Sequence, residues 1–269
     1  MTSIFSLTAM LLYAGAWIAL LRTLSADGPR DRVGTFDGLL GYLAVMAHGL
    51  VLIPAFFLGG HPNLPLGSTF SLIALIIAAL FLAVRLVQPI QGLGVLIFPF
   101  AFTGVVFGWL LPGPTYAAKL HGATSLFHLL GAGLACALLS LSLAQALLLH
   151  FHDRDLKRKR AGGFFKSFPP IQTMENVLFQ MVYLGFGLLT LTLLSGALSS
   201  GQMFGQVLLF NHHTILALLA WMSLAALVLG RILLGWRGRA AVLWTGLGFF
   251  LLATGYFGTR FVLEILLAS

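Results

Sequence analysis

The sequence predicts an all-α integral membrane protein with eight transmembrane helices and both termini on the outer, periplasmic side. Three observations lead to this class. Hydrophobic residues make up 59% of the 269 positions and charged residues only 8%, with a mean hydropathy of +1.00. A soluble domain of this length does not keep so few charges. The apolar residues also form runs of about 20, the length of helix that crosses a bilayer core, and the cations gather in alternate connections between the runs.

Eight apolar runs meet the length condition. We place the predicted spans near 3–22, 37–57, 68–87, 92–111, 124–150, 174–198, 208–231 and 241–266. No basic segment precedes the first run, so we expect it to stay in the protein as a span and not to act as a cleaved signal peptide. Pro54 and Pro99 fall inside two spans and are accommodated as ordinary kinks. Because no stretch between the runs is long enough to fold alone, we expect a single transmembrane domain over residues 1–269.

The connections between the runs differ in charge. Thirteen of the fifteen Lys and Arg lie in or beside the first, third, fifth and seventh connections, and only Lys119 and Arg260 lie on the other side. The positive-inside rule makes the first side cytoplasmic. The most basic connection, 151–173, sets the topology in this interpretation; binding of anionic lipid or a partner is the alternative. We also expect Thr173 to be the N-cap of the sixth span, with Glu175 in its first turn.

Several classes of function are disfavoured by composition. The one cysteine, Cys136, lies within an apolar run, so disulfides and thiolate metal clusters are not expected. The net charge of +8 does not indicate nucleic acid, because the cations lie in short loops between spans. No nucleophile, acid–base pair or nucleotide motif is visible, so we do not predict an enzyme. The partner that the sequence does predict is the lipid bilayer of a bacterial inner membrane.

The histidines are the residues most suggestive of chemistry. His150 and His152 lie at the basic end of the fifth span, where we expect them to be solvated. The other six lie on or toward the outer side: His48, His61, His121, His128, His212 and His213. At 1.5 Å per residue, His128 and His213 lie roughly 6–8 Å below the outer boundary, and His48 lies roughly 14 Å deep. Ionisable groups at such depth are costly and favour a functional role.

Neutral imidazole is the usual axial ligand of haem iron. A flat macrocycle beside a helix needs small residues along the same helix face, and two histidines have them. Gly131, Ala132 and Ala135 follow His128, while Ala217 and Ala220 follow His213. The corresponding face of His212 is bulkier. The alternative is that these small residues only serve helix–helix packing. A discrete zinc site is disfavoured because no carboxylate or thiolate accompanies the histidines.

Four stretches of the second half resemble a known family. They are SLFHLLGAGLACALLSLSLAQALLL, FPPIQTMENVLFQMVYLGFGLLTLTLLSG, HHTILALLAWMSLAALVLGRILLGWRGRAAVLWTGLGF and YFGTRFVLE. They are similar to the cytochrome c assembly protein family, the group that includes CcsA, CcmC and HemX-like proteins, and most closely to its YpjD-like inner-membrane branch. The resemblance implies a fold that handles haem, whose assembly members present haem at the outer face for attachment to apocytochrome c.

The chain also departs from the family pattern. The segment GQMFGQVLLFNHH lacks the tryptophan-rich, WDP-type motif that precedes this span in assembly members. Two histidines that ligate haem in those members would fall near Gly230 and Arg260, and both are missing. His128 is retained at the position of an outer ligand histidine, and His48 corresponds to a histidine in an early span. The expected site therefore differs from that of a complete synthase.

We predict a haem-binding chaperone or accessory factor of cytochrome c assembly, with haem b as cofactor and other assembly components as partners. His128 and His213 are the predicted iron ligands, with His212 as substitute and His48 as second choice. Arg260 and Lys119 are expected to pair with the propionates. The alternative is a HemX-like regulatory or scaffolding membrane protein without haem. A small-solute or ion transporter is a third hypothesis, disfavoured because paired, Gly/Pro-broken spans are not evident.

Overall fold

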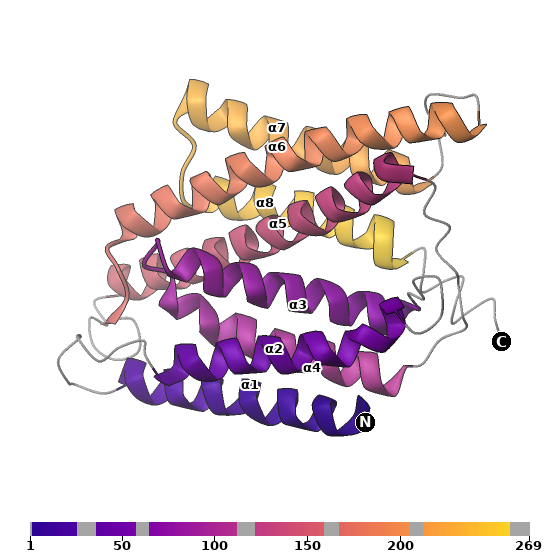
Figure 1. Ribbon diagram of the computed structural model, residues 1–269. Helices are drawn as coiled ribbons and strands as arrows, with labels where there is room; N and C mark the ends of the chain where they lie inside the picture. Colours follow the sequence, from indigo (N-terminus) through magenta and orange to yellow (C-terminus); the bar gives the residue numbers. More distant parts are fainter. Residues whose placement is uncertain are drawn as a thin grey trace. The chain divides into compact units, whose positions relative to one another are not determined.

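The protein is entirely helical within the residues that the structure describes, which are 2–25, 36–57, 65–111, 122–158, 167–204 and 212–258 of a computed structural model. The helices are α1 (Thr2–Ser25), α2 (Phe36–Phe57), α3 (Leu66–Arg85), α4 (Gly94–Leu110), α5 (Gly122–Lys157), α6 (Ile171–Phe204), α7 (His212–Leu234) and α8 (Arg239–Ala253) (Figure 1). A 3₁₀ turn, η2 (Gln91–Leu93), precedes α4, and a π-helical segment, η4 (Thr254–Gly258), follows α8. Over these ranges eight helices are long and apolar enough to cross a membrane. The predicted all-α, eight-span class is therefore confirmed, and the side on which the termini lie stays a prediction.

Two helices are longer than a bilayer requires. α5 has 36 residues and α6 has 34, so each is roughly 50 Å long against a hydrocarbon core of about 30 Å. The predicted span 124–150 ended too early because it was limited by bilayer length. Arg154 and Lys157 instead occupy the last turn of α5, where the helix dipole favours cations.

The start of α6 corrects a second prediction. The helix begins at Ile171 and not after Thr173, and the Met174 amide donates to the Pro170 carbonyl at 3.1 Å. Proline suits the first positions of a helix because its fixed φ is already helical and its missing N–H would have no partner there. Thr173 is therefore inside the first turn and is not the N-cap.

The chain forms two compact units. Unit 1 comprises Met1–Ala118 and Phe151–Met174, and unit 2 comprises Lys119–His150 and Glu175–Ser269. Unit 1 holds α1 to α4 with the end of α5 and the start of α6. Unit 2 holds most of α5 and α6 with α7, α8 and η4. The expectation of a single domain over 1–269 stays a prediction.

In unit 1, α1 packs against α2 and α4, and α3 packs against α4 and α2 (Figure 1). Aromatic rings fill the centre: Phe81 and Phe98 meet edge to face with centroids 5.6 Å apart, and both are fully buried. Gly104 lets α4 approach α3, because a Cβ there would lie 2.3 Å from Ala74 Cβ. Close approach of helices through small residues is the usual packing mode in membranes.

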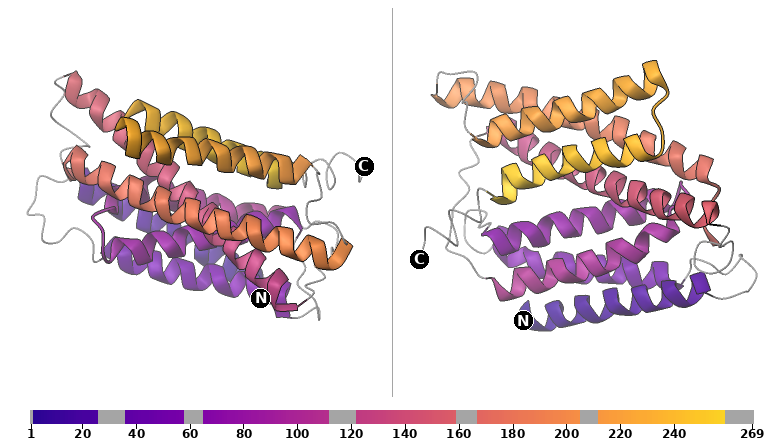
Figure 2. Two further views of the ribbon diagram at one scale, coloured as in Figure 1. Left: turned by 90° about the horizontal axis from the view of Figure 1, so that it is seen from above. Right: turned by 180° about the vertical axis from the view of Figure 1, so that it is seen from behind.

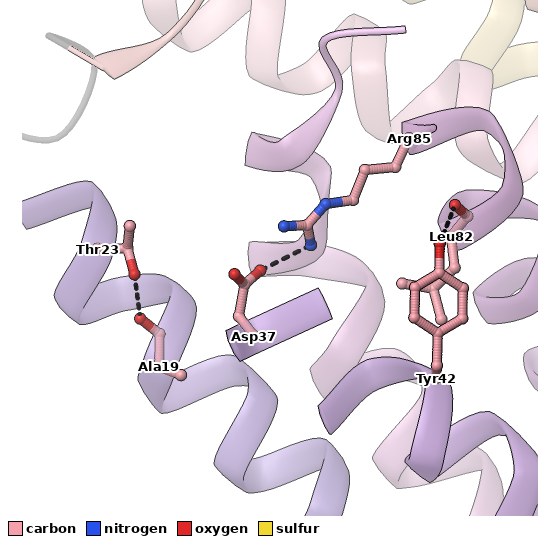
Figure 3. Close-up of polar contacts among 6 residues, drawn as sticks. All are labelled: Ala19, Thr23, Asp37, Tyr42, Leu82 and Arg85. Carbon is pink, nitrogen blue, oxygen red and sulfur yellow. Dashed lines mark hydrogen bonds and ion pairs between the residues drawn. The ribbon is translucent and has the colours of Figure 1, made fainter. Parts of the chain in front are cut away.

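A buried ion pair joins α2 to α3 in the same unit. The guanidinium of Arg85, in the last turn of α3, donates to the Asp37 carboxylate at 2.7 Å (Figure 3). The two side chains are only 7% and 3% exposed. One turn further along α2, the Tyr42 hydroxyl donates to the Leu82 carbonyl at 3.1 Å. Arg85 therefore has a structural partner besides its contribution to the positive side of the membrane.

The end of α5 corrects the expectation that His152 is solvated. His152 is 6% exposed. Its Nδ1 lies 3.3 Å from Met174 Sδ, and its ring meets Phe168 edge to face. Phe168 in turn fills the space beside Gly92, where a Cβ would lie 2.3 Å from the ring. His150 is half-buried, so neither histidine is freely solvated.

In unit 2, α7 and α8 run antiparallel, side by side, joined by a short turn (Figure 2). The turn needs two left-handed residues, Gly235 at φ 65° and Gly238 at φ 51°, a conformation that favours glycine. The core combines Ala135 and Leu139 of α5, Leu189 of α6 and Leu224 of α7.

Candidate functional site

His128 is fixed against α6 by its own hydrogen bonds. Its Nδ1 lies 3.0 Å from the Thr192 carbonyl oxygen and 3.2 Å from Ser195 Oγ. Because a carbonyl oxygen only accepts, Nδ1 carries the proton and Nε2 keeps its lone pair. Within the described ranges the structure assigns no hydrogen bond to Nε2. A histidine that ligates a metal has this arrangement, with one nitrogen free and the other donating to a fixed acceptor.

Gly196 makes room for the His128 ring. A Cβ at position 196 would lie 2.9 Å from Cε1 of the imidazole, so any larger residue would displace the ring. The ring is half-buried. Thus α6 contributes both the acceptor that sets the tautomer of His128 and the space that the ring occupies.

Several of the small residues that follow the histidines take part in packing. A Cβ at Gly131 would lie 3.0 Å from Thr192 Oγ1. Ala135 belongs to the hydrophobic core of unit 2, and Ala217 and Ala220 are buried on α7. These positions pack helix against helix, which is the alternative that the sequence left open.

His213 and His212 are the first two residues of α7, and both are exposed. His213 follows His212 directly in the first turn of α7. His128 and His213 both belong to unit 2, and their meeting at one iron stays a prediction. Deeper in the same unit, the Trp221 indole donates to Thr190 Oγ1 at 2.9 Å and links α7 to α6.

Tyr256 is a neighbour of this site that the sequence did not indicate. Its ring meets the His213 imidazole in a T-shaped contact with centroids 6.4 Å apart. It belongs to the π-helical segment η4, which contacts α7. A π-helical turn is not visible in hydrophobic periodicity, so only the two aromatic residues between Gly255 and Gly258, Tyr256 and Phe257, could have drawn attention to it.

His48 belongs to unit 1 and is fully buried. Its Nδ1 lies 3.2 Å from the Tyr13 hydroxyl, and its Nε2 lies 2.8 Å from Ser71 Oγ. Both ring nitrogens thus have partners inside the helix bundle. Iron ligation at His48 would require one of these bonds to break.

Other predicted positions lie outside the described residues. These are Arg260 and Lys119, expected near the propionates, and the outer-loop residues His61 and His121.

The ring of Trp236 fills the space beside Gly230. A Cβ at Gly230 would lie 2.3 Å from Cε3 of Trp236, and Trp236 stacks on Trp244 with centroids 5.7 Å apart. A histidine at position 230, as expected in assembly members, would not fit beside this tryptophan.

The residue after Gly230 makes a second buried ion pair. Arg231 donates to Glu175 of α6 at 2.7 Å, and its guanidinium lies 4.2 Å from the centre of the Phe179 ring. Arg237 approaches the same carboxylate at 3.7 Å. Glu175, predicted to interact with the dipole of α6, is instead the acceptor that holds the end of α7.

Haem iron and a bare metal ion differ in the number of ligands that they need from a protein. Over the described ranges, no group of three or more His, Cys, Asp or Glu lies close enough to hold a metal. A single ion needs about four protein or water ligands, whereas haem iron needs only one or two axial ligands from the protein. One or two imidazoles near the end of a helical unit meet that smaller requirement.

The eight spans define a polytopic α-helical membrane protein, with imidazole side chains near the end of one unit. Comparison of the sequence then assigns the family. Residues 37–267 match the profile of the family described as Cytochrome C assembly protein, and the chain belongs to that family.

Relatives of similar length also match the chain. It is 26% identical to Inner membrane protein YpjD of Escherichia coli (strain K12), over 98% of this chain and 99% of that protein. It is 24% identical to an uncharacterized 28.8 kDa protein of Azospirillum brasilense, over 98% of each chain. The branch suggested by the sequence motifs is thereby supported.

A shorter match reaches the assembly proteins themselves. The chain is 31% identical to Cytochrome c biogenesis protein CcsA of Picosynechococcus sp. over 88 residues, which are 33% of this chain and 26% of that protein. No solved structure matches the chain.

Proposed function

We propose that this protein binds haem b in the bacterial inner membrane, near the periplasmic face, as a chaperone or accessory factor of cytochrome c assembly. Membership of the family supports a role related to cytochrome c biogenesis. The relative named as an inner membrane protein supports the location. The observation that carries the proposal is His128, whose Nδ1 donates to the Thr192 carbonyl and whose Nε2 is left with a lone pair.

In this proposal His128 and His213 hold the iron, and His212 is the substitute for His213. Bound haem supplies an iron that two imidazoles can ligate, and in an assembly role it is also the cargo. Neutral ligands suit the site because a buried charge at membrane depth costs a few kcal/mol. Ser195 and Thr192 orient His128, and Arg260 and Lys119 pair with the propionates.

A second function is favoured by the packing at position 230. Trp236 occupies the space where an assembly member is expected to carry a ligand histidine. A protein in which a tryptophan fills the place of this ligand would act as a HemX-like regulatory or scaffolding protein without haem. The two functions differ in one property, whether the purified protein binds haem.

The test is an absorbance spectrum of the purified protein in detergent, before and after haem is added. We expect a Soret band with low-spin features. His128→Ala should shift the spectrum toward five-coordinate iron, because one axial ligand is lost. His212→Ala is the matched control, since it removes an exposed imidazole next to His213, and it should change the spectrum less than His213→Ala does.

Two outcomes would contradict the proposal. A protein that stays colourless after addition of haem would favour the scaffolding function. An unaltered low-spin spectrum in the double variant His128→Ala, His213→Ala would show that the iron is held by other residues.

A further inference from the structure

At the end of α8 the chain changes from α-helical to π-helical hydrogen bonding, and no feature of the sequence predicted this change. Residues Thr254–Gly258 form a π-helical turn directly after the α-helix. Such turns are rare and occur frequently at functional sites. This one lies beside the first turn of α7, where His213 is located.

Gly255 brings the π-helical turn close to α7. A Cβ on Gly255 would lie 3.2 Å from Leu216 Cβ and 3.7 Å from the His213 carbonyl oxygen. The first distance is tighter than ordinary van der Waals contact, so an alanine would push the two backbones apart by a few tenths of an ångström. The glycine therefore sets the separation at which the next residue, Tyr256, meets its neighbour.

We infer that Tyr256 is a positioning residue of the haem site, which fixes the plane of the His213 imidazole. The two rings lie at 67° to each other with centroids 6.4 Å apart, within the range of favourable edge-to-face pairs. Phe257 also contacts the tyrosine, with ring centroids 5.4 Å apart and planes at 88°. The expected effect on haem rests on the proposed function, whereas the contact between Tyr256 and His213 does not.

The contact with Tyr256 gives the His213 ring a defined orientation. His128 is oriented by a carbonyl and a hydroxyl, whereas His213 is exposed at the start of its helix. A ligand imidazole must be held in one orientation, usually by its surroundings. At His213 the ring of Tyr256 supplies that constraint by packing.

The first arm of the test uses the haem-free protein. The rate at which diethyl pyrocarbonate modifies His213 is measured by tandem mass spectrometry, with His212 as internal reference. Tyr256→Leu should raise the ratio of the two rates roughly two- to tenfold, the range that loss of one aromatic pair represents. Tyr256→Phe keeps the ring and should behave as the wild type. Phe250→Leu, an exposed aromatic of α8, is the matched control and should change nothing.

The second arm uses the haem-loaded protein. The g-values of low-spin ferric haem depend on the angle between the planes of its two axial imidazoles. Tyr256→Leu should therefore shift and broaden the electron paramagnetic resonance signal while haem remains bound. Tyr256→Phe should restore the wild-type signal, and Gly255→Ala should give an intermediate one.

The two arms separate failure of this inference from failure of the proposed function. A wild-type protein that binds no haem, with a raised His213 rate in Tyr256→Leu, would refute haem binding and leave the contact standing. If Tyr256→Leu leaves the modification rates of the haem-free protein unchanged, and also the g-values of the haem-loaded protein, the role of Tyr256 alone would be overturned.

Discussion

Arg231, in the last turn of α7, donates a hydrogen bond of 2.7 Å to Glu175 near the start of α6. The side chains are 16% and 7% exposed, so the pair is largely removed from water. Breaking one member of such a pair is costly, because the other charge stays buried without compensation.

We therefore expect Arg231→Met to destabilise the protein by about 3 kcal/mol. Arg237, at 3.7 Å from the same carboxylate, keeps the loss from being larger. The double variant Arg231→Met, Glu175→Leu removes both charges and should recover most of the stability. Thermal unfolding in detergent measures both variants.

The control for this prediction is the exposed pair of Lys157 and Asp153, whose side chains are 75% and 40% exposed. Lys157→Ala should leave the unfolding temperature unchanged, since exposed pairs contribute little. A double variant less stable than Arg231→Met would show that the ion pair has a role beyond neutralising buried charge.

The ion pairs show where sequence reasoning succeeded and where it stopped. Hydropathy and length predicted all eight spans, because a helix that crosses a bilayer core needs about 20 mostly apolar residues. The same rule gave no information on contacts between helices. Arg85 and Arg231 were interpreted as topology signals, and their acceptors Asp37 and Glu175 emerged only when the helices were packed. The only signal of these ion pairs in the sequence was the position of an acidic residue at the edge of an apolar span.

The site was predictable to a similar degree. His128 was identified from residue type and resemblance, but the Thr192 carbonyl that fixes its tautomer is 64 positions away in the sequence. A backbone acceptor leaves no trace in residue identity. His152 was assigned to solvent because its neighbours along the chain are charged, whereas contacts with Phe168 and Met174 help to bury it.

A second prediction concerns Gly230. We expect Gly230→Ala to destabilise the protein by about 1–3 kcal/mol, the usual cost of overpacking, because the new methyl would overlap the Trp236 ring. The stacking of Trp236 on Trp244 should be lost as well. Tryptophan fluorescence and thermal unfolding report the two effects.

The matched control is Gly187 of α6, beside which a Cβ would find open space. Gly187→Ala should be neutral or slightly stabilising, since alanine is the better helix former. Equal stability of the two alanine variants would mean that Trp236 can move away freely. In that case Gly230→His becomes a fair attempt to restore the missing family histidine.

A third prediction concerns orientation in the membrane. The connection 151–173 should be cytoplasmic and the connection 112–122 periplasmic, because thirteen of the fifteen cations lie on the former side. Alkaline phosphatase, which is active only in the periplasm, should be inactive when fused at Ala161 and active when fused at Ala117. The reverse pattern would invert the topology and place His128 and His213 toward the cytoplasm.

The last prediction separates the two kinds of histidine in this protein. His48 is fully buried, and both of its ring nitrogens have hydroxyl partners, Tyr13 and Ser71. His48→Ala would leave two buried hydroxyls unpartnered at about 1–3 kcal/mol each, in addition to a cavity. We therefore expect a large fall in the unfolding temperature of His48→Ala and a smaller one in Tyr13→Phe, which removes one bond only. Neither variant should change the Soret band or the ratio of haem to protein.

His128→Ala should do the opposite, changing the spectrum with little effect on unfolding, because its ring is half-buried and a partly exposed residue loses less on truncation. A His48→Ala variant that unfolds like the wild type but loses the Soret band would make His48 the iron ligand, since the absence of a stability cost would mean that the two hydroxyls do not depend on it.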